Sequence, residues 1–129
     1  MRDEIIEIYE KDEAINRVLE ILKKHSFDDL IKTKHFLYSI EEKGTDPKLL
    51  RENFAEFSRV KLIVKRKHKT SSKISYDFYY KLDDKIYLMY AISFEKQKPA
   101  LINAFQIDRN FERFKNWIVN TYKDQLIGQ

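Results

Sequence analysis

The sequence contains no cysteine, only two glycines and two prolines, and no long apolar run. The lack of cysteine excludes disulfides and thiolate metal sites, and it is typical of proteins from the reducing interior of a cell. No stretch approaches the roughly 20 apolar residues that span a bilayer, and the first 25 residues alternate charged with apolar side chains, unlike a signal peptide. We therefore expect a soluble, cytoplasmic protein with no membrane partner.

The chain has 129 residues, of which 43% are hydrophobic. This length suits one domain with a real core and is too short for two, so we predict a single domain over residues 1–129. Charged residues make up 36% of the chain and are rich in lysine and glutamate, a bias that is compatible with a thermophile. The net charge of +4 matters less than its distribution, because the positive charge is concentrated in one segment.

The stretch from Val60 to Ile107 has the pattern of an antiparallel β meander. Aromatic and β-branched residues, which suit a pleated and half-buried surface, fill three long runs, and a shorter run precedes them. The predicted strands are residues 60–65, 75–82, 85–94 and 100–107. We predict an α+β fold with a mainly antiparallel sheet of about four strands.

Apolar residues at helical spacing precede and follow the meander. In the N-terminal segment, Ile5, Ile8 and Ile15 fall near one face of an amphipathic helix that we expect over about Asp3–Lys24. Further predicted helices span about residues 34–44, 46–57 and 110–126. The domain thus divides into an N-terminal helix (1–25), an α+β core (26–109) and a C-terminal helix (110–127).

Short motifs mark where several of these elements begin and end. Ser26–Asp29 has the spacing of a capping box, and Gly44 suits the left-handed residue that follows a helix. Asp46 and Pro47 have the pattern of an N-cap followed by proline at the first helical position. Residues 29–33 fit either a short edge strand or the first turn of a helix.

Alternation within the strands separates two faces of the sheet. We expect one face to form the core and to contact at least one helix. Its central residues are Tyr80, Leu88, Tyr90 and Ile92. The opposite face carries Tyr79 and Tyr87, together with Asn103 or Phe105, beside the basic segment. Such rings next to lysines can stack bases and neutralise phosphates, although ordinary sheet packing also explains these tyrosines.

The most basic stretch of the chain, residues 65–73, lies between the first two predicted strands and is interpreted as a hairpin loop. Its cations can contact the phosphates of a nucleic acid, but a flexible, solvated hairpin would have the same composition. The candidate nucleic-acid-binding residues are Lys65, Arg66, Lys67, His68, Lys69, Lys73 and, from the sheet, Tyr87. A nucleic acid is therefore an expected partner.

The sequence has no phosphate loop and no other classical catalytic motif, and its three histidines lack metal-ligand spacing. We therefore predict no metal and no cofactor. His25 suits the end of a helix, where an imidazolium meets the helix dipole, and His68 adds a donor to the basic segment. His35 begins a helix whose apolar side leads to the sheet, and both a structural and a chemical role fit it.

The order of these features resembles a known family. Thr33-Lys34-His35-Phe36 opens a helix and Glu42-Lys43-Gly44 closes it; a second helix, a strand, a basic hairpin and further strands follow, the last ending Ile107-Asp108-Arg109. Over about residues 30–109 this pattern is similar to the RelE/ParE-type toxins and their relatives among small ribonucleases. The resemblance implies a small α+β ribonuclease of a toxin-antitoxin system, which cuts RNA without a metal and is inhibited by an antitoxin protein.

Cleavage of RNA without a metal requires side chains in three roles. One removes the proton of the ribose 2′-hydroxyl, cations stabilise the charge on the phosphate, and another group protonates the leaving 5′-oxygen. Histidine, tyrosine, lysine and arginine can fill these roles, and Arg109 matches a position at which the family keeps a polar group. The candidate catalytic residues are His35, Arg66, Lys67, Tyr79 and Arg109. Two alternatives stay open, a non-catalytic nucleic-acid-binding module and a protein-interaction domain.

Overall fold

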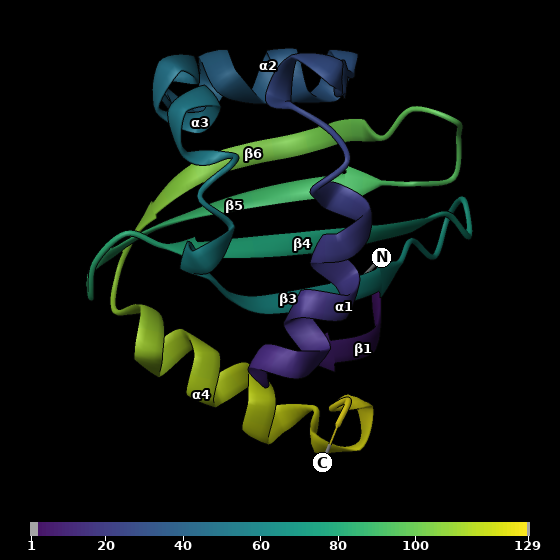
Figure 1. The fold of residues 1–129 in the computed structure, drawn as a ribbon, viewed down its shortest axis with the longest axis vertical. Coiled ribbons are helices and arrows are strands. Elements are labelled where there is room, and N and C mark those ends of the chain that lie inside the picture. The colour runs from purple at the N-terminus through teal and green to yellow at the C-terminus, as the bar shows by residue number, and fades with distance from the viewer. Residues whose placement is uncertain (1–2, 129) are drawn as a thin grey trace.

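A six-stranded sheet forms the centre of the protein (Figure 1). The structure is a computed structural model that describes residues 3–128, so positions 1, 2 and 129 of the predicted domain lie outside the described residues. The strand order is β1-β3-β4-β5-β6-β2, and all neighbouring strands are antiparallel except β6 and β2. The strands are β1 Glu4–Tyr9, β2 Ile31–Lys32, β3 Val60–Lys67, β4 Ile74–Lys81, β5 Ile86–Ser93 and β6 Ala100–Asp108. The α+β fold and the meander are confirmed, and the sheet has more strands than the four predicted.

The helices begin largely where the local motifs indicate. Ser26 and Asp29 form a complete capping box, Gly44 ends α2 with a φ of 64°, and the Asp46 side chain accepts from the backbone N–H of Lys48 at the start of α3. The helices are α1 Asp12–Leu22, α2 Lys34–Lys43, α3 Pro47–Asn53 and α4 Phe111–Thr121, with short 3-10 turns η1 Phe27–Asp29, η2 Phe57–Arg59 and η3 Lys123–Gln125. Thus α3 and α4 end earlier than predicted. Of the two alternatives for residues 29–33, the edge strand is correct, because this segment contains β2.

The prediction of a helix from Asp3 is wrong at its beginning, because residues 4–9 form β1 at the edge of the sheet. This strand pairs with β3, and its register shifts between Ile5 and Glu7. A bulge of this kind inserts a residue and turns the following side chains over. Ile5 and Ile8 therefore pack into the same apolar cluster, and their three-residue spacing imitates one face of a helix.

The basic segment is less of a loop than predicted. Its first three residues continue β3, since Lys65, Arg66 and Lys67 pair with β4 on one side and with β1 on the other. The turn itself spans only residues 68–73, and Ser72 has a φ of 57° there. The alternation of a strand thus sends Lys65 and Arg66 to opposite faces of the sheet.

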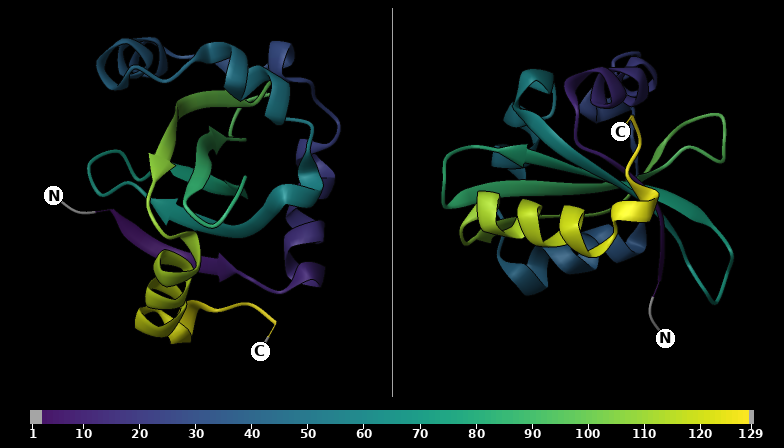
Figure 2. Two further views of the ribbon diagram at one scale, coloured as in Figure 1. Left: turned by 90° about the vertical axis from the view of Figure 1, so that its left-hand side faces the viewer. Right: turned by 90° about the horizontal axis from the view of Figure 1, so that it is seen from below.

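Helices cover the sheet from both sides, and each face has its own apolar core (Figure 2). On the first face α1 and α3 pack on β3, β4 and β5. As predicted, the core residues there are buried: Tyr80, Leu88, Tyr90 and Ile92. Burial raises the pKa of both tyrosines, so their hydroxyls stay protonated. The hydroxyl of Tyr80 donates to the carbonyl of Phe54 at 2.7 Å, and that of Tyr90 to the carbonyl of Leu50 at 2.6 Å.

The second face is covered at one end by α4. Tyr87 is fully buried there, and its ring centroid lies 5.0 Å from that of Phe111 and 5.7 Å from that of Phe114. Tyr79 is also buried, with its ring centroid 5.1 Å from that of Phe114. The interpretation of these tyrosines as a platform for bases is therefore corrected: α4 occupies the place where a base would stack. Figure 2 shows α2 on the same side of the sheet, beside β6.

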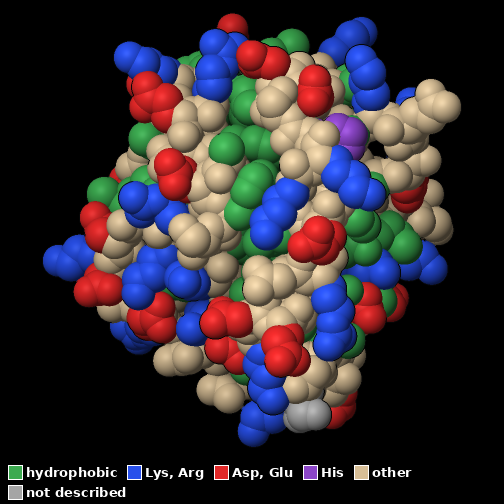
Figure 3. All heavy atoms as spheres, in the orientation of Figure 1, with side chains coloured by type: hydrophobic (Ala, Val, Ile, Leu, Met, Phe, Trp, Pro, Cys, Tyr) green, Lys and Arg blue, Asp and Glu red, His purple; other side chains and the backbone are tan. Residues whose placement is uncertain are grey.

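Charges of both signs are interspersed on the face that carries α1 (Figure 3). That surface therefore has no extended patch of one charge. Within residues 3–128, none of the helices combines the length and the apolar character needed to cross a membrane.

We predict that Tyr80→Phe destabilises the protein by about 1–3 kcal/mol, because a buried carbonyl loses its donor. Tyr90→Phe should destabilise the protein less, since the Leu50 carbonyl still accepts a hydrogen bond from the backbone N–H of Phe54. Urea unfolding of both variants measures the difference. Tyr38→Phe is the control, because Tyr38 is 63% exposed and should change stability by less than about 0.5 kcal/mol. Equal effects of all three changes would contradict this account of the core.

Candidate functional site

A cavity of about 450 Å³ opens on the second face of the sheet, in the part that α4 leaves uncovered. Its floor follows from the register of the strands. Asp77 of β4 lies opposite Ala91 of β5, which lies opposite Asn103 of β6. Alanine at the centre of this row leaves room above the sheet, and polar side chains stand on both sides of it. The hollow is therefore a consequence of a small residue between two polar ones.

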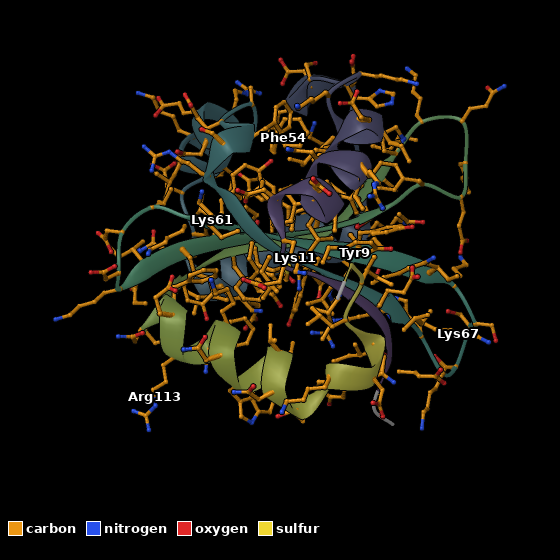
Figure 4. The ribbon with its side chains drawn as sticks, turned by 60° about the horizontal axis from the view of Figure 1, so that its bottom comes forward. Tyr9, Lys11, Phe54, Lys61, Lys67 and Arg113 are labelled. Atoms are coloured by element: carbon orange, nitrogen blue, oxygen red, sulfur yellow. The ribbon has the colours of Figure 1, made fainter. Side chains whose placement is uncertain are left out.

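Four of the five residues that the sequence suggests for catalysis line this cavity. They are His35, Arg66, Tyr79 and Arg109. They come from α2, β3, β4 and the end of β6, so the tertiary structure brings together positions that are more than 70 residues apart in the chain. Lys67 is exposed at the end of β3 and does not line the cavity (Figure 4).

The proposed RNA-binding residues are spread over several places. Arg66 and His68 line the cavity, Lys73 lines a neighbouring hollow, and Lys69 is exposed in the turn.

Lys65 belongs to the first face of the sheet, where its Nζ lies 3.3 Å from Glu7 Oε1. A hydrogen bond from the Tyr9 hydroxyl and this lysine together hold the pKa of Glu7 below its usual value, against the effect of burial. The buried Tyr87 cannot contact a nucleic acid, so only part of the predicted set remains available.

His35 reaches the cavity because the beginning of α2 is attached to β6. The hydroxyl of Thr33, the N-cap of this helix, lies 3.1 Å from the carbonyl oxygen of Leu101, to which it donates. It also accepts from the backbone N–H of Phe36, as an N-cap side chain does. This double role joins the helix to the strand, and it places the exposed His35, the second residue of α2, at the cavity.

Arg66 and Asp77 form an ion pair between β3 and β4 at the base of the cavity. Burial disfavours the charge on Arg66, but the carboxylate of Asp77 outweighs this effect and raises the pKa of the guanidinium. Burial also raises the pKa of Asp77, and Arg66 opposes that shift. Arg66 therefore remains a cation at the cavity, with part of its charge compensated by its partner.

Tyr79 and Arg109 lie on the side of the cavity next to α4. Burial and the nearby Asp77 raise the pKa of Tyr79, so its phenol keeps its proton and can donate a hydrogen bond but cannot act as a base. Arg109 donates from Nε to the Tyr87 hydroxyl at 3.2 Å, and its guanidinium carbon lies 5.7 Å from the centroid of the Phe114 ring. Since arginine has five N–H donors, this single bond leaves most of them for a ligand.

His68 is held from two directions. Its Nδ1 lies 3.1 Å from Asp3 Oδ2 and its Nε2 lies 3.0 Å from Ser75 Oγ. The imidazole therefore has a defined orientation at the edge of the cavity. Ser75 is almost fully buried, so its hydroxyl acts as a fixed partner of this histidine.

Sequence reasoning missed Asp77 and Ser75 as parts of the site. Asp77 is the one acidic residue inside an aromatic strand, and strands are poor in aspartate. This unusual position was the feature of the sequence that could have identified Asp77.

Asn103 was placed on the correct face, but the state of its side chain is visible only in the structure. Its side-chain Oδ1 is buried without a hydrogen-bond partner among the described residues, a state that usually costs stability. A ligand with an N–H or O–H group would satisfy this oxygen.

The cavity lining has more basic than acidic side chains. The basic residues are His35, Lys43, Arg66, His68 and Arg109, and the acidic ones are Asp3 and Asp77. Lys43 closes one side, with its Nζ 3.5 Å from the centroid of the Phe105 ring. Within residues 3–128 no three histidine, aspartate or glutamate side chains are arranged to hold a metal ion. The lining thus suits an anionic ligand such as a phosphate.

Comparison of the chain with protein-family models, with curated proteins and with solved structures finds no match. The site is therefore interpreted from its own residues.

We predict strong energetic coupling between Arg66 and Asp77. Removing either side chain alone leaves the other charge largely buried, so Arg66→Ala and Asp77→Ala should each destabilise the protein by up to about 3 kcal/mol. The double variant should lose less free energy of unfolding than the two single variants lose together. The difference, measured by urea unfolding in a double-mutant cycle, should be about 1–3 kcal/mol. The matched control is the exposed ion pair of Arg51 and Asp28, in which Arg51 Nη2 lies 3.1 Å from Asp28 Oδ1. The coupling energy of this pair should stay below about 1 kcal/mol. Similar coupling for both pairs would contradict the assigned burial.

Proposed function

We propose that the protein is a ribonuclease that cleaves RNA by attack of the ribose 2′-hydroxyl on the adjacent phosphate, without a metal ion. One observation carries the proposal: His35, Arg66, Tyr79 and Arg109 line a single cavity of about 450 Å³. This set contains a histidine, a residue type that serves as a general acid or base, and two guanidinium groups. Such a combination is what the chemistry of metal-free RNA cleavage requires.

In this proposal the two arginines bind the scissile phosphate. Arg66 is fixed by its pair with Asp77, and Arg109 is tethered by one bond to Tyr87. The negative charge on phosphorus increases as the new bond forms, and preorganised N–H donors stabilise that increase without rearrangement. Tyr79 adds a protonated phenol. The unpaired Oδ1 of Asn103 accepts a hydrogen bond from the sugar or the base.

His35 acts as the base and His68 as the acid. His35 removes the proton of the 2′-hydroxyl, the bond between O2′ and phosphorus forms, and the bond between phosphorus and O5′ breaks. His68 donates a proton to the leaving O5′ from its Nε2, which leaves Ser75 Oγ, while the Asp3 carboxylate holds its Nδ1. The products are a 2′,3′-cyclic phosphate and a 5′-hydroxyl. Solvent returns both histidines to their starting states.

The place of this activity in a toxin-antitoxin system rests on the resemblance to the RelE/ParE-type toxins. The proposed partners are RNA, on the ribosome if the protein acts as a toxin, and an antitoxin protein that blocks the cavity. DNA is not a substrate in this proposal because it has no 2′-hydroxyl.

The test is incubation of the purified protein with single-stranded RNA in the presence of a chelator. We expect cleavage products that end in a 2′,3′-cyclic phosphate. His35→Ala should lower the rate by about 100-fold or more and should change RNA affinity much less, because a base acts on the chemical step. The matched control is His25→Ala: His25 follows α1 and does not line the cavity, so the rate should be unchanged.

A toxin that needs the ribosome to position its message would look inactive on naked RNA, so the assay is repeated with translating ribosomes. Intact RNA in both settings, with normal growth of cells that overproduce the protein, overturns the ribonuclease proposal. If RNA binds and Arg109→Ala weakens that binding without any cleavage, the protein is a nucleic-acid-binding module. If no RNA binds at low salt, the protein-interaction alternative remains.

A further inference from the structure

Two further hollows adjoin the central cavity, one at each side. The first has a volume of about 670 Å³ and lies against α4; it shares Arg109 and Phe114 with the central cavity. The second, of about 390 Å³, shares His68 and Ile102 with it. Because each neighbour has lining residues in common with the centre, the three hollows lie next to one another on the surface.

The hollow at α4 is bordered by the only tryptophan of the chain. Trp117 is 57% exposed, and its ring centroid lies 6.4 Å from that of Phe114, with an angle of 34° between the ring planes. Arg113, which extends outward from α4 in Figure 4, lines the same hollow. An exposed indole beside an arginine is the arrangement on which nucleic-acid bases stack with little dependence on sequence.

The hollow on the other side lies between two turns of the meander, residues 68–73 and 95–99. Three exposed lysines line it: Lys73, Lys96 and Lys98. The one acidic residue of its lining, Glu95, accepts a hydrogen bond at 2.7 Å from the backbone N–H of Ile74, which joins the two turns. Three lysines against one engaged carboxylate make this end attractive to phosphates.

We propose that the three hollows form a track for single-stranded RNA, with a base-stacking subsite at Trp117 and a phosphate-binding subsite at the three lysines. The scissile phosphate lies between them, at Arg66 and Arg109, and only this central assignment rests on the proposed ribonuclease activity. Subsites on both sides of the cut make the enzyme an endonuclease. A duplex does not fit, because its bases are paired and stacked on one another and none can stack on Trp117.

The fluorescence of Trp117 tests the track directly, since no other tryptophan contributes. The probe is an RNA oligonucleotide with 2′-O-methyl groups throughout, which cannot be cleaved by its own 2′-oxygen. We expect saturable quenching by the single strand and much less by a duplex of the same sequence. Inorganic polyphosphate, which carries charge but no bases, should bind without quenching.

Two sets of variants locate the subsites by affinity, measured from the anisotropy of a labelled oligonucleotide. Trp117→Ala should weaken binding about fivefold to 150-fold, the loss of one stacked base. Lys96→Ala with Lys98→Ala should lower the slope of log K against log salt by about 0.7 for each lost phosphate contact. Lys23→Ala with Lys24→Ala is the matched control at the end of α1, outside the three hollows, and should leave the slope unchanged.

The outcomes separate the two proposals. Quenching and the expected losses of affinity, without cleavage of ordinary RNA either free or on translating ribosomes, support the track and reject the ribonuclease. Cleavage of RNA with no quenching, and with normal affinity in Trp117→Ala, rejects the track and leaves the ribonuclease. Equal quenching by polyphosphate or by duplex also overturns the track. Because the quenching is measured in the unaltered protein, the test does not depend on the folding of any variant.

Discussion

Both faces of the central strands are apolar, and neither can be left in water. Along β5, Leu88, Tyr90 and Ile92 point to one side and Tyr87 and Met89 to the other, and all are buried. A sheet with two apolar faces needs two covering layers. The helices α1 and α3 cover the first face and α4 covers part of the second, so the positions of these three helices follow from this requirement.

The candidate site lies where the second layer is incomplete. Here α4 packs on Tyr79 and Tyr87, while α2 is attached to β6 through Thr33. Between these two helices the sheet is open, and the row of Asp77, Ala91 and Asn103 has polar side chains on both sides of a small apolar one. The cavity is therefore not an addition to the fold but the uncovered remainder of a face that is otherwise core.

A polar cluster inside an apolar layer is costly unless its groups are paired. Arg66 and Asp77 satisfy each other, and His68 is held by Asp3 and Ser75. Replacing a buried ion pair by apolar residues is often neutral or stabilising, so stability alone does not account for the pair. The buried Oδ1 of Asn103 has no hydrogen-bond partner among the described residues. A buried polar atom without a partner calls for an explanation such as a functional role, and the proposed role of the cavity supplies one.

Local chemistry determined those features that the sequence predicts correctly. The capping box at Ser26, the left-handed Gly44 and the proline at the start of α3 act through their nearest neighbours, so a short stretch of sequence is enough to identify them. Strand alternation separated the two faces for the same reason. The sequence also pointed to His35 and Arg109 at the ends of predicted elements, and both line the cavity.

Contacts between distant segments decided the rest. The residues of β1 have a helical spacing, and only the free edge of β3 and a bulge make them a strand. The sequence cannot tell that Tyr87 would lie beneath Phe111, since that burial depends on where α4 packs. Arg66 and Asp77 are 11 residues apart, and only the register of β3 on β4 makes them partners. Such pairings depend on the summed free energy of packing the whole sheet, which no single stretch of the sequence contains.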